Sequence, residues 1–349
     1  MQKTEWSIPL KSFASDNYSG VAPEILRAII AANHEHAPSY GNDNYTKEAQ
    51  ELLRQIFGAE SISYFAYNGT AANAAGVKAI LRSHHALICA DTAHIATHEV
   101  GAATYLTGCP TLLIPHTNGK ITAAEIQQVY DKTCYWKHHS NLPKVVSIAQ
   151  STEFGTVYTV PELQAISAIC RKNNLLFHMD GCRLSNAAAY LNVSLAAISR
   201  DVGVDVLSFG GTKNGMMFGE AIVFFQPELA AEFAYMHKQN LQLNSKMRFM
   251  SAQFIPYLKD SLWHRYASHA NKMCERLTKG LLAMKDVTAA HPQQTNQLFA
   301  YLPEKMIQAT QEKYPFYLFD KNRNLARLVT SFDTTVEEVD QFVALASAA

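Results

Sequence analysis

The segment VDVLSFGGTKNG (residues 204–215) joins a continuous apolar run to a glycine-rich turn that carries a single lysine, Lys213. An apolar run without alternation is typical of a strand that is buried on both faces of a sheet. A lysine in such a turn is either a solvated surface residue or a side chain aimed into a cleft. The rest of the sequence decides between these two interpretations.

Further apolar runs of similar length occur along the chain, and helical patterns separate most of them. They are ISYFA (62–66), ALICA (86–90), TLLIP (111–115), KVVSI (144–148), LLFHM (175–179) and AIVFF (221–225). Strands that alternate with helices predict an α/β fold with a mostly parallel seven-stranded sheet between helices. Because no helix separates 204–209 from 221–225, we expect that pair to be antiparallel.

Polar clusters follow five of these runs at the point where each predicted strand ends. They are NGT (68–70), DTAH (91–94), QSTE (150–153), DGCR (180–183) and GGTKNG (210–215). In open parallel sheets, ligands bind at the carboxyl ends of the strands. The five clusters therefore predict one shared site, into which Lys213 points.

The pattern changes after about residue 226. Amphipathic helices are predicted over roughly 227–285, followed by short strands at 297–302, 315–319 and 325–330. A capping box, Thr335 with Glu338, predicts a last helix. We predict a large domain over 13–245 and a smaller C-terminal α+β domain over 246–349, with the segment 1–12 packed on it.

Composition excludes several classes of protein. The 349 residues are 48% hydrophobic, and 30 Lys and Arg balance 30 Asp and Glu, so nothing indicates a nucleic-acid surface. No apolar run is long enough for a membrane span or a secretory signal. Six scattered cysteines show neither a C-x-x-C pair nor zinc-finger spacing, which favours reduced thiols in a cytoplasmic protein.

The polar clusters contain the parts of a pyridoxal-phosphate (PLP) site. Gly69 and Thr70 stand where a helix begins, and free N–H groups there bind phosphate, although plain helix capping is the simpler interpretation. Asp180 ends an apolar strand and needs a partner, either a pyridinium nitrogen or Arg183. Lys213 can form a Schiff base. The dinucleotide, P-loop and nucleophile-elbow motifs do not occur.

The motifs, taken in order, resemble those of the threonine aldolase/β-eliminating lyase family. They are SDN, NGTAAN, AHIATHEVGA, HMDGCRLSNA, SFGGTKNG and RLVTSFDTT, spread over about 13–345. HMDGCRLSNA corresponds to the family's H-x-D-G-A-R-x-x-N-A, and SKMRFMSAQ is similar to the phenylserine-aldolase branch. The resemblance implies the PLP-dependent aspartate-aminotransferase fold (fold type I) and a homodimer or homotetramer with active sites at the subunit interface.

The resemblance also implies a role for each matching position. The cofactor would be held by Lys213 as a Schiff base, Asp180 at the ring nitrogen, His94 on the ring face, Gly69 and Thr70 at the phosphate, and Arg248 of a neighbouring subunit. The substrate carboxylate would be held by Ser15, Arg327 and Arg183, the last also beside the cofactor. Without the resemblance, His94 is one surface histidine among 14 and Arg327 a solvated strand-end arginine.

One segment departs from the family. Many members have E-N-T-H after the fourth strand, and its histidine is thought to assist deprotonation of the substrate hydroxyl. This chain reads AQSTEFGTVY, and alignment back from Pro161 puts Thr152 in place of that histidine. His98 lies four residues after His94 on the same helix face and could take the role, as could Thr152 or a water that it holds.

We therefore predict a PLP-dependent carbon–carbon lyase of amino acid metabolism. It would cleave β-hydroxy-α-amino acids of the threonine, allo-threonine or phenylserine type to glycine and an aldehyde. β-Elimination on the same parts is the alternative, and no membrane partner is expected. A metal-dependent hydrolase is a distant alternative, because HIATHE places His94 and His98 at i and i+4 without forming H-E-x-x-H.

Overall fold

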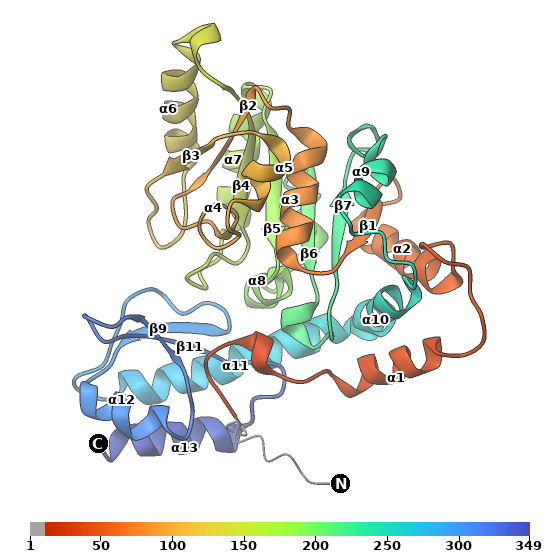
Figure 1. Cartoon of the computed structure of the whole chain (residues 1–349). Helices are drawn as coiled ribbons and strands as arrows, with labels where there is room; N and C mark the ends of the chain where they lie inside the picture. The colour runs from red at the N-terminus through yellow and green to blue at the C-terminus, as the bar shows by residue number, and fades with distance from the viewer. Residues whose placement is uncertain (1–10) are drawn as a thin grey trace.

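A seven-stranded sheet with helices packed on it forms the larger part of the molecule, and a four-stranded sheet with its own helices lies beside it (Figure 1). The structure is a computed structural model that describes residues 11–349. Residues 1–10, which include most of the segment predicted to pack on the small domain, lie outside the described residues.

The large sheet has the order β1-β7-β6-β5-β4-β2-β3. Its strands are β1 (Ile62–Ala66), β2 (His85–Ala90), β3 (Thr111–Ile114), β4 (Leu142–Ala149), β5 (Leu176–Gly181), β6 (Val206–Gly210) and β7 (Glu220–Phe224). β7 runs antiparallel to both neighbours, and the other pairs are parallel. The mostly parallel sheet and its antiparallel pair are confirmed.

This topology gathers the polar clusters at one edge. The carboxyl ends of the six parallel strands meet there, together with the amino end of β7 at Glu220. α3 (Gly69–Ile80) packs on the face that carries Val206 and Ile222, while Leu207 on the other face approaches α8 (Leu184–Leu191). Both faces are thus covered, and the strand-end edge stays open for a site.

The remaining helices of the large part are α1 (Pro23–Ala32), α2 (Asn44–Phe57), α4 (His94–Thr97), α5 (Ala102–Thr107), α6 (Ala123–Cys134), α7 (Val160–Lys172), α9 (Phe233–Gln239) and α10 (Arg248–Leu258). Capping boxes start α6 at Thr122 and α7 at Thr159. No helix of the described chain combines the length and apolar character of a membrane span.

The smaller part contains α11 (Leu262–Leu282), α12 (Glu304–Gln311) and α13 (Val336–Ser347), with β8 (Thr288–Ala289), β9 (Gln297–Tyr301), β10 (Tyr317–Asp320) and β11 (Leu325–Val329). Its antiparallel sheet has the order β10-β11-β9-β8. Thr335 and Glu338 form the predicted capping box of α13. The region predicted as long helices is interrupted, because residues 240–247 and 259–261 break it.

Two hydrophobic cores meet along α11. Trp263 and Tyr266, near its start, pack in the core of the large sheet, whereas Cys274 and Leu281 pack in the core of the small one. The domain division between residues 245 and 246 stays a prediction, and this packing favours a division inside α11. Phe13 also packs in the small core, so the first described residues lie against the C-terminal part.

Candidate active site

A chain of hydrogen bonds links the ends of three elements at the open edge. Asn73, on the buried side of α3, donates to Asp180 Oδ2 at 2.8 Å and to Glu99 Oε1 at 2.9 Å. Glu99 accepts from His94 Nδ1 at 2.9 Å, which fixes the imidazole ring at the start of α4. The network places the His94 ring beside the strand end that carries Asp180.

Asp180 is held in its ionised form. Burial acts to raise the pKa of this carboxyl, but the charge of Lys213 and hydrogen bonds from Cys182 and Asn73 outweigh it and lower the pKa below its usual value. Arg183 does not pair with Asp180. Its guanidinium instead grips Asp16 with bonds of 2.7 and 2.8 Å. Asp180 therefore keeps its charge for another partner.

Lys213 belongs to a short 3-10 turn, η4 (Thr212–Asn214), directly after β6. The residue after η4, Gly215, has φ of 100°. This conformation favours glycine and turns the chain back towards β7. The positive charge of Lys213 acts on three nearby carboxyl groups, Asp16, Asp180 and Glu220. It favours the ionised form of each and so acts to lower their pKa values. A cationic side chain at this edge faces an acidic site.

Glu220 is a buried carboxyl that the sequence analysis did not single out. Its Oε2 atom has no hydrogen-bond partner among the described residues. Burial raises its pKa to about 7, and the charge of Lys213 works against that shift. Because β7 is antiparallel, its first residue reaches the same edge as the polar clusters of the parallel strands.

The start of α3 forms a cradle for an anion. Asn68 caps the helix by accepting from Ala71 N at 2.8 Å, and the N–H groups of Gly69 and Thr70 have no acceptor among the described residues. A Cβ atom on Gly69 would lie 2.6 Å from Cys182 Sγ. Only glycine therefore lets the helix end approach the loop after β5.

Two arginines lie close together beyond β5. Arg327, on β11, donates two hydrogen bonds to Gln297 Oε1, at 3.1 and 2.9 Å. Burial, and then the positive charge of Arg183, lower the pKa of Arg327 to about 10, so it stays charged at neutral pH. No carboxylate of the described chain pairs with it. An enclosed guanidinium without a paired carboxylate is suited to binding an anion.

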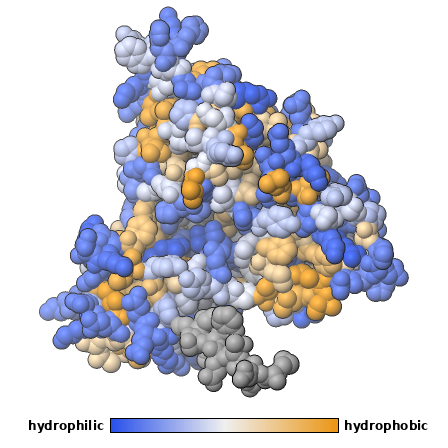
Figure 2. All heavy atoms as spheres, viewed as in Figure 1, coloured by the Kyte–Doolittle hydropathy of each residue, from blue (hydrophilic) through white to orange (hydrophobic). Residues whose placement is uncertain are grey.

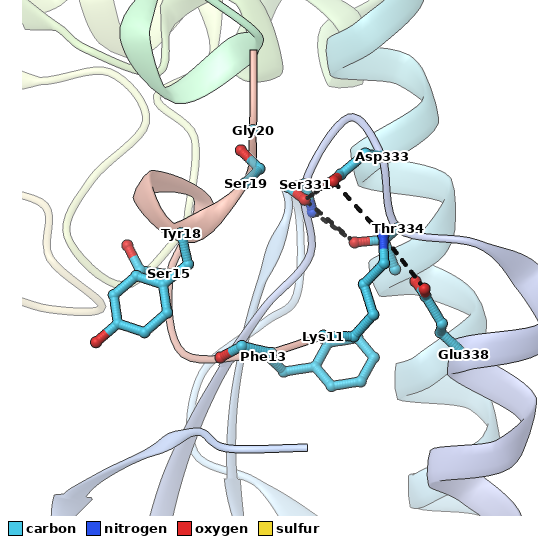
Figure 3. Close-up of a pocket in the computed structure, with 11 residues that line it drawn as sticks. Lys11, Phe13, Ser15, Tyr18, Ser19, Gly20, Ser331, Asp333, Thr334 and Glu338 are labelled. Atoms are coloured by element: carbon cyan, nitrogen blue, oxygen red, sulfur yellow. Dashed lines mark hydrogen bonds and ion pairs between the residues drawn. The ribbon is translucent and has the colours of Figure 1, made fainter. Parts of the chain in front are cut away.

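Ser15 directly precedes Asp16, the partner of Arg183, but its own hydroxyl makes a different contact. It caps η1 (Asp16–Tyr18) by accepting from Asn17 N at 3.1 Å, and it lines the pocket drawn in Figure 3. The pocket lies between the N-terminal segment and the loop before α13, where Lys11 pairs with Asp333 and Glu338. Neither Arg183 nor Arg327 lines it.

The two candidates for proton transfer differ in their surroundings. His98 caps the C-terminus of α4, and its ring stacks on that of His94 with centroids 5.7 Å apart, as the spacing predicted. Its Nδ1 lies 2.7 Å from Thr97 Oγ1. Thr152 is buried, and its hydroxyl lies 2.7 Å from Thr156 Oγ1 inside the turn after β4.

Arg248 begins α10, away from the cradle of Gly69 and Thr70 in the sequence. Its guanidinium donates to the Glu35 carbonyl at 3.0 Å and lines a surface pocket with Ser39 and Lys246. No cradle residue lines that pocket. The contact between Arg248 and the phosphate of a neighbouring subunit, which the resemblance implies, stays a prediction.

The metal interpretation finds a weaker basis. His94, Glu99 and Asp180 offer ligand atoms within 4.8 Å of one another, but His98 is not part of that cluster among the described residues. The amide nitrogen of Asn73 donates to both carboxylates, and a donor there opposes a cation. The cluster is better explained as the anchor of the His94 ring.

Comparison with known proteins assigns the chain to a family. A sequence model of the β-eliminating lyases matches residues 12–305. The chain is 45% identical to low specificity L-threonine aldolase of Pseudomonas aeruginosa, over 94% of this chain and 95% of that protein.

The chain belongs to the β-eliminating lyase family.

Further relatives agree with this assignment. A low specificity L-threonine aldolase of a Pseudomonas species is 41% identical, with 96% of each chain covered. Threonine aldolase of Leishmania major has a TM-score of 0.92 at 31% identity and covers 97% of this chain and 99% of its own. A Bacillus subtilis ureidoglycine–glyoxylate aminotransferase, 14% identical, shares the fold with a TM-score of 0.71, covering 99% and 94%.

The predicted family, PLP fold type I, lyase class and dependence on PLP are thereby confirmed. The likeness to the phenylserine branch stays a prediction. The donor set of this family member fits PLP, because free N–H groups at Gly69 and Thr70 suit its phosphate and the ionised Asp180 suits its ring nitrogen. Lys213 is the amine beside them.

Several site residues escaped sequence reasoning. They are Asp16, Asn73, Glu99, Glu153, Glu220 and Gln297. Asn73 lies in NGTAAN and Glu99 in AHIATHEVGA, so the quoted motifs contained both. Asp16 lies in SDN, which was also quoted, but its partner Arg183 is 167 residues away. Gln297 carried no such signal, because its partner Arg327 lies 30 residues away.

Proposed function

We propose that Lys213, Asp180 and His94 hold PLP in this chain, and that Arg327 binds the carboxylate of an amino acid substrate. The chain is a PLP-dependent carbon–carbon lyase that cleaves β-hydroxy-α-amino acids to glycine and an aldehyde. One observation carries the residue roles: an enclosed, unpaired guanidinium shares the strand-end edge with an ionised aspartate and a lysine.

Each cofactor contact follows from a physical property of its residue. The N–H groups of Gly69 and Thr70 bind the phosphate at the positive end of α3. Asp180 keeps a proton on the ring nitrogen, because its carboxylate stays ionised. Lys213 supplies the amine that bonds to the cofactor. When bound, PLP withdraws the electron pair left on Cα as the Cα–Cβ bond breaks.

The substrate is held by its carboxylate. The Arg327 fork binds the two oxygens, with Gln297 keeping the guanidinium in place through two hydrogen bonds. Arg183, neutralised by Asp16, contributes less charge but shapes the same wall. Ser15 directly precedes Asp16, which bonds to Arg183, and its hydroxyl would have to turn from the pocket of Figure 3 to reach the carboxylate.

The β-hydroxyl proton of the substrate must pass to a nearby group as the bond breaks. His98, stacked on His94, and Thr152, or a water that it holds, are the groups predicted from the sequence. A positioned acid/base typically contributes about 10²–10⁴-fold to the rate.

A second copy of the chain is the proposed partner. Figure 2 shows hydrophobic atoms gathered over α1, where Leu26 is 40% and Ile30 72% exposed. Such a patch favours a subunit contact. Arg248 would then reach the phosphate cradle of the neighbouring site. The six described cysteines are unpaired, which favours the cytoplasm as the compartment.

Product analysis tests the proposed reaction. Purified protein with PLP is incubated with threonine, allo-threonine or phenylserine, and the products are identified by mass spectrometry. We expect glycine with acetaldehyde or benzaldehyde. Pyruvate or another keto acid with ammonia, and no glycine, would show β-elimination instead. Lys213→Ala serves as the control that lacks the proposed cofactor amine.

A further inference from the structure

One carboxyl group at the site, that of Glu153, has no role in the proposed binding of cofactor and substrate. Glu153 lies in QSTE, immediately after β4, and its Oε1 accepts the His94 N–H at 2.8 Å. The charges of Asp180 and His94 both act on it, so the carboxyl lies among the groups that face the cofactor.

The two oxygens of this carboxyl are in different situations. Oε1 is fixed on α4 by the His94 N–H, whereas no hydrogen bond holds Oε2 among the described residues. The side chain is only partly buried, and Oε2 is not sealed from solvent as the free oxygens of Glu99 and Glu220 are. One oxygen therefore anchors the group, and the other is open to a reactant.

We propose that Glu153 is the base that removes the β-hydroxyl proton of the substrate. The inference rests on the proposed aldol cleavage. The proton moves to Glu153 Oε2, the O–H electron pair becomes the second C–O bond of the aldehyde, and the Cα–Cβ pair stays with the glycine part. Cα then takes up a proton from water, which gives glycine, and Glu153 returns its own proton to water through its open side.

The sequence agrees with this assignment once the loop is read from the strand end. Q-S-T-E then aligns with E-N-T-H without a gap. The two threonines coincide, and Glu153 takes the place of the histidine. Alignment from Pro161 put Thr152 there. The structure separates the two, because the Thr152 hydroxyl bonds to Thr156 inside the turn, whereas Glu153 reaches the His94 backbone.

The other candidate from the sequence is less well placed than Glu153. His98 is exposed, and its only hydrogen bond among the described residues goes to Thr97, its neighbour in sequence. Its contact with the site is the stacking of its ring on His94. Glu153, in contrast, is anchored across 59 residues to the first residue of α4.

The protonation of Glu153 suits the role. Burial raises its pKa to about 7, so both states are populated near neutral pH, as acid–base catalysis requires. The groups that face it from the surrounding elements are Cys89 in β2, His94 on α4, Asp180 on β5 and Tyr158 in its own loop. The base form is lost as pH falls below about 7.

Glu153→Gln tests the proposal, because glutamine keeps an oxygen for the His94 N–H but accepts no proton. We expect kcat for threonine-type substrates to fall by ~10²-fold or more, with cofactor absorbance and KM unchanged. The low-pH limb of the kcat profile should disappear. Glu153→His should restore part of the rate, with a limb near the ordinary histidine pKa of about 6.5.

Two further measurements make the outcome unambiguous. Infrared difference spectra of the cofactor-free protein should show carboxylic acid absorption that titrates at about pH 7, from Glu153 and Glu220, and Glu153→Gln should lose the Glu153 part of it. Glu228→Gln, at an exposed glutamate, is the matched control and should behave as wild type.

The failures of the two proposals are distinguishable. A wild-type protein that releases no glycine and aldehyde contradicts the proposed function. An active wild type whose kcat survives Glu153→Gln within threefold contradicts only the role of Glu153. Loss of cofactor in Glu153→Gln also contradicts it, since that result means that the carboxyl merely positions His94.

Discussion

At the scale of single residues, charge placement explains the site better than residue type does. Arg183 and Arg327 carry the same group, yet Asp16 neutralises the first and only an amide, Gln297, supports the second. The guanidinium left without an anion is the one expected to bind the substrate. Because Arg183 pairs with Asp16, Asp180 has no arginine partner and stays available for the cofactor.

Arg327→Lys is predicted to weaken substrate binding and spare the cofactor. Lysine keeps the charge but loses the fork, and a lost charged hydrogen bond costs about 1.5–3 kcal/mol, or roughly 10–100-fold in Kd. Glycine titrations followed by the cofactor spectrum measure this. Arg323→Lys, at an exposed arginine of the preceding turn, is the control. Unchanged glycine affinity in Arg327→Lys would refute the role.

Sequence reasoning proposed residues whose expected partner is the cofactor and missed those whose partners are other side chains. Lys213 and Asp180 were predicted because the sequence shows them directly after buried strands. Asp16 and Glu99 were missed, since an ion pair 167 residues apart or a bond through Asn73 depends on how strands are ordered. Glu153 was quoted in QSTE, but the alignment from Pro161 assigned its place to Thr152.

At the scale of elements, local patterns predicted strands well and interruptions poorly. Each apolar run became a strand, and the helix-free turn between 204–209 and 221–225 gave the antiparallel pair. The break between α10 and α11 at 259–261 lacked a comparable signal. It contains left-handed backbone at Asp260 and Ser261.

The helix α3 gives a prediction that separates steric from electrostatic requirements. Gly69→Ala places a Cβ against Cys182 Sγ, and overpacking of this kind costs about 1–3 kcal/mol. We expect the Kd for PLP to rise roughly tenfold or more. Cys182→Ala removes the sulfur, so the double variant should regain most of the affinity. Equilibrium dialysis with PLP measures all three variants.

Cys182→Ala alone is the control and should bind PLP as wild type does. A double variant as weak as Gly69→Ala would mean that the phosphate itself needs the bare glycine, and that the Cys182 contact is irrelevant.

At the scale of the whole molecule, Asp16 ties the two parts together. It receives bonds from Arg183 at the end of the large sheet and from Asn296 Nδ2, ahead of β9, at 3.0 Å. Phe13, three residues earlier, packs in the small core and pairs with Pro315 and Val329. The start of the described chain therefore holds the site between two cores (Figure 1).

Asp16→Asn is predicted to lower the free energy of unfolding by about 3 kcal/mol at neutral pH, because Arg183 is left enclosed and unpaired. Burial opposes ionisation of Asp16, but Arg183 lowers its pKa below 3.8. The stabilisation is thus complete above the unfolded pKa and is lost as pH falls through the folded one. The difference between wild type and variant should shrink below about pH 4.

Denaturant unfolding of the cofactor-free proteins across pH measures this effect. Asp340→Asn, which breaks an exposed pair with Arg276, is the control and should change little. Equal stability of Asp16→Asn and wild type at pH 7 would contradict the bridging role.

Borohydride reduction of the holoenzyme, followed by proteolysis and mass spectrometry, tests most directly that PLP binds through Lys213. The account predicts one modified peptide, which contains SFGGTKNG and carries the cofactor on Lys213. It also predicts that Lys213→Ala yields no modified peptide. A cofactor fixed on any other lysine of the wild-type protein would contradict the account.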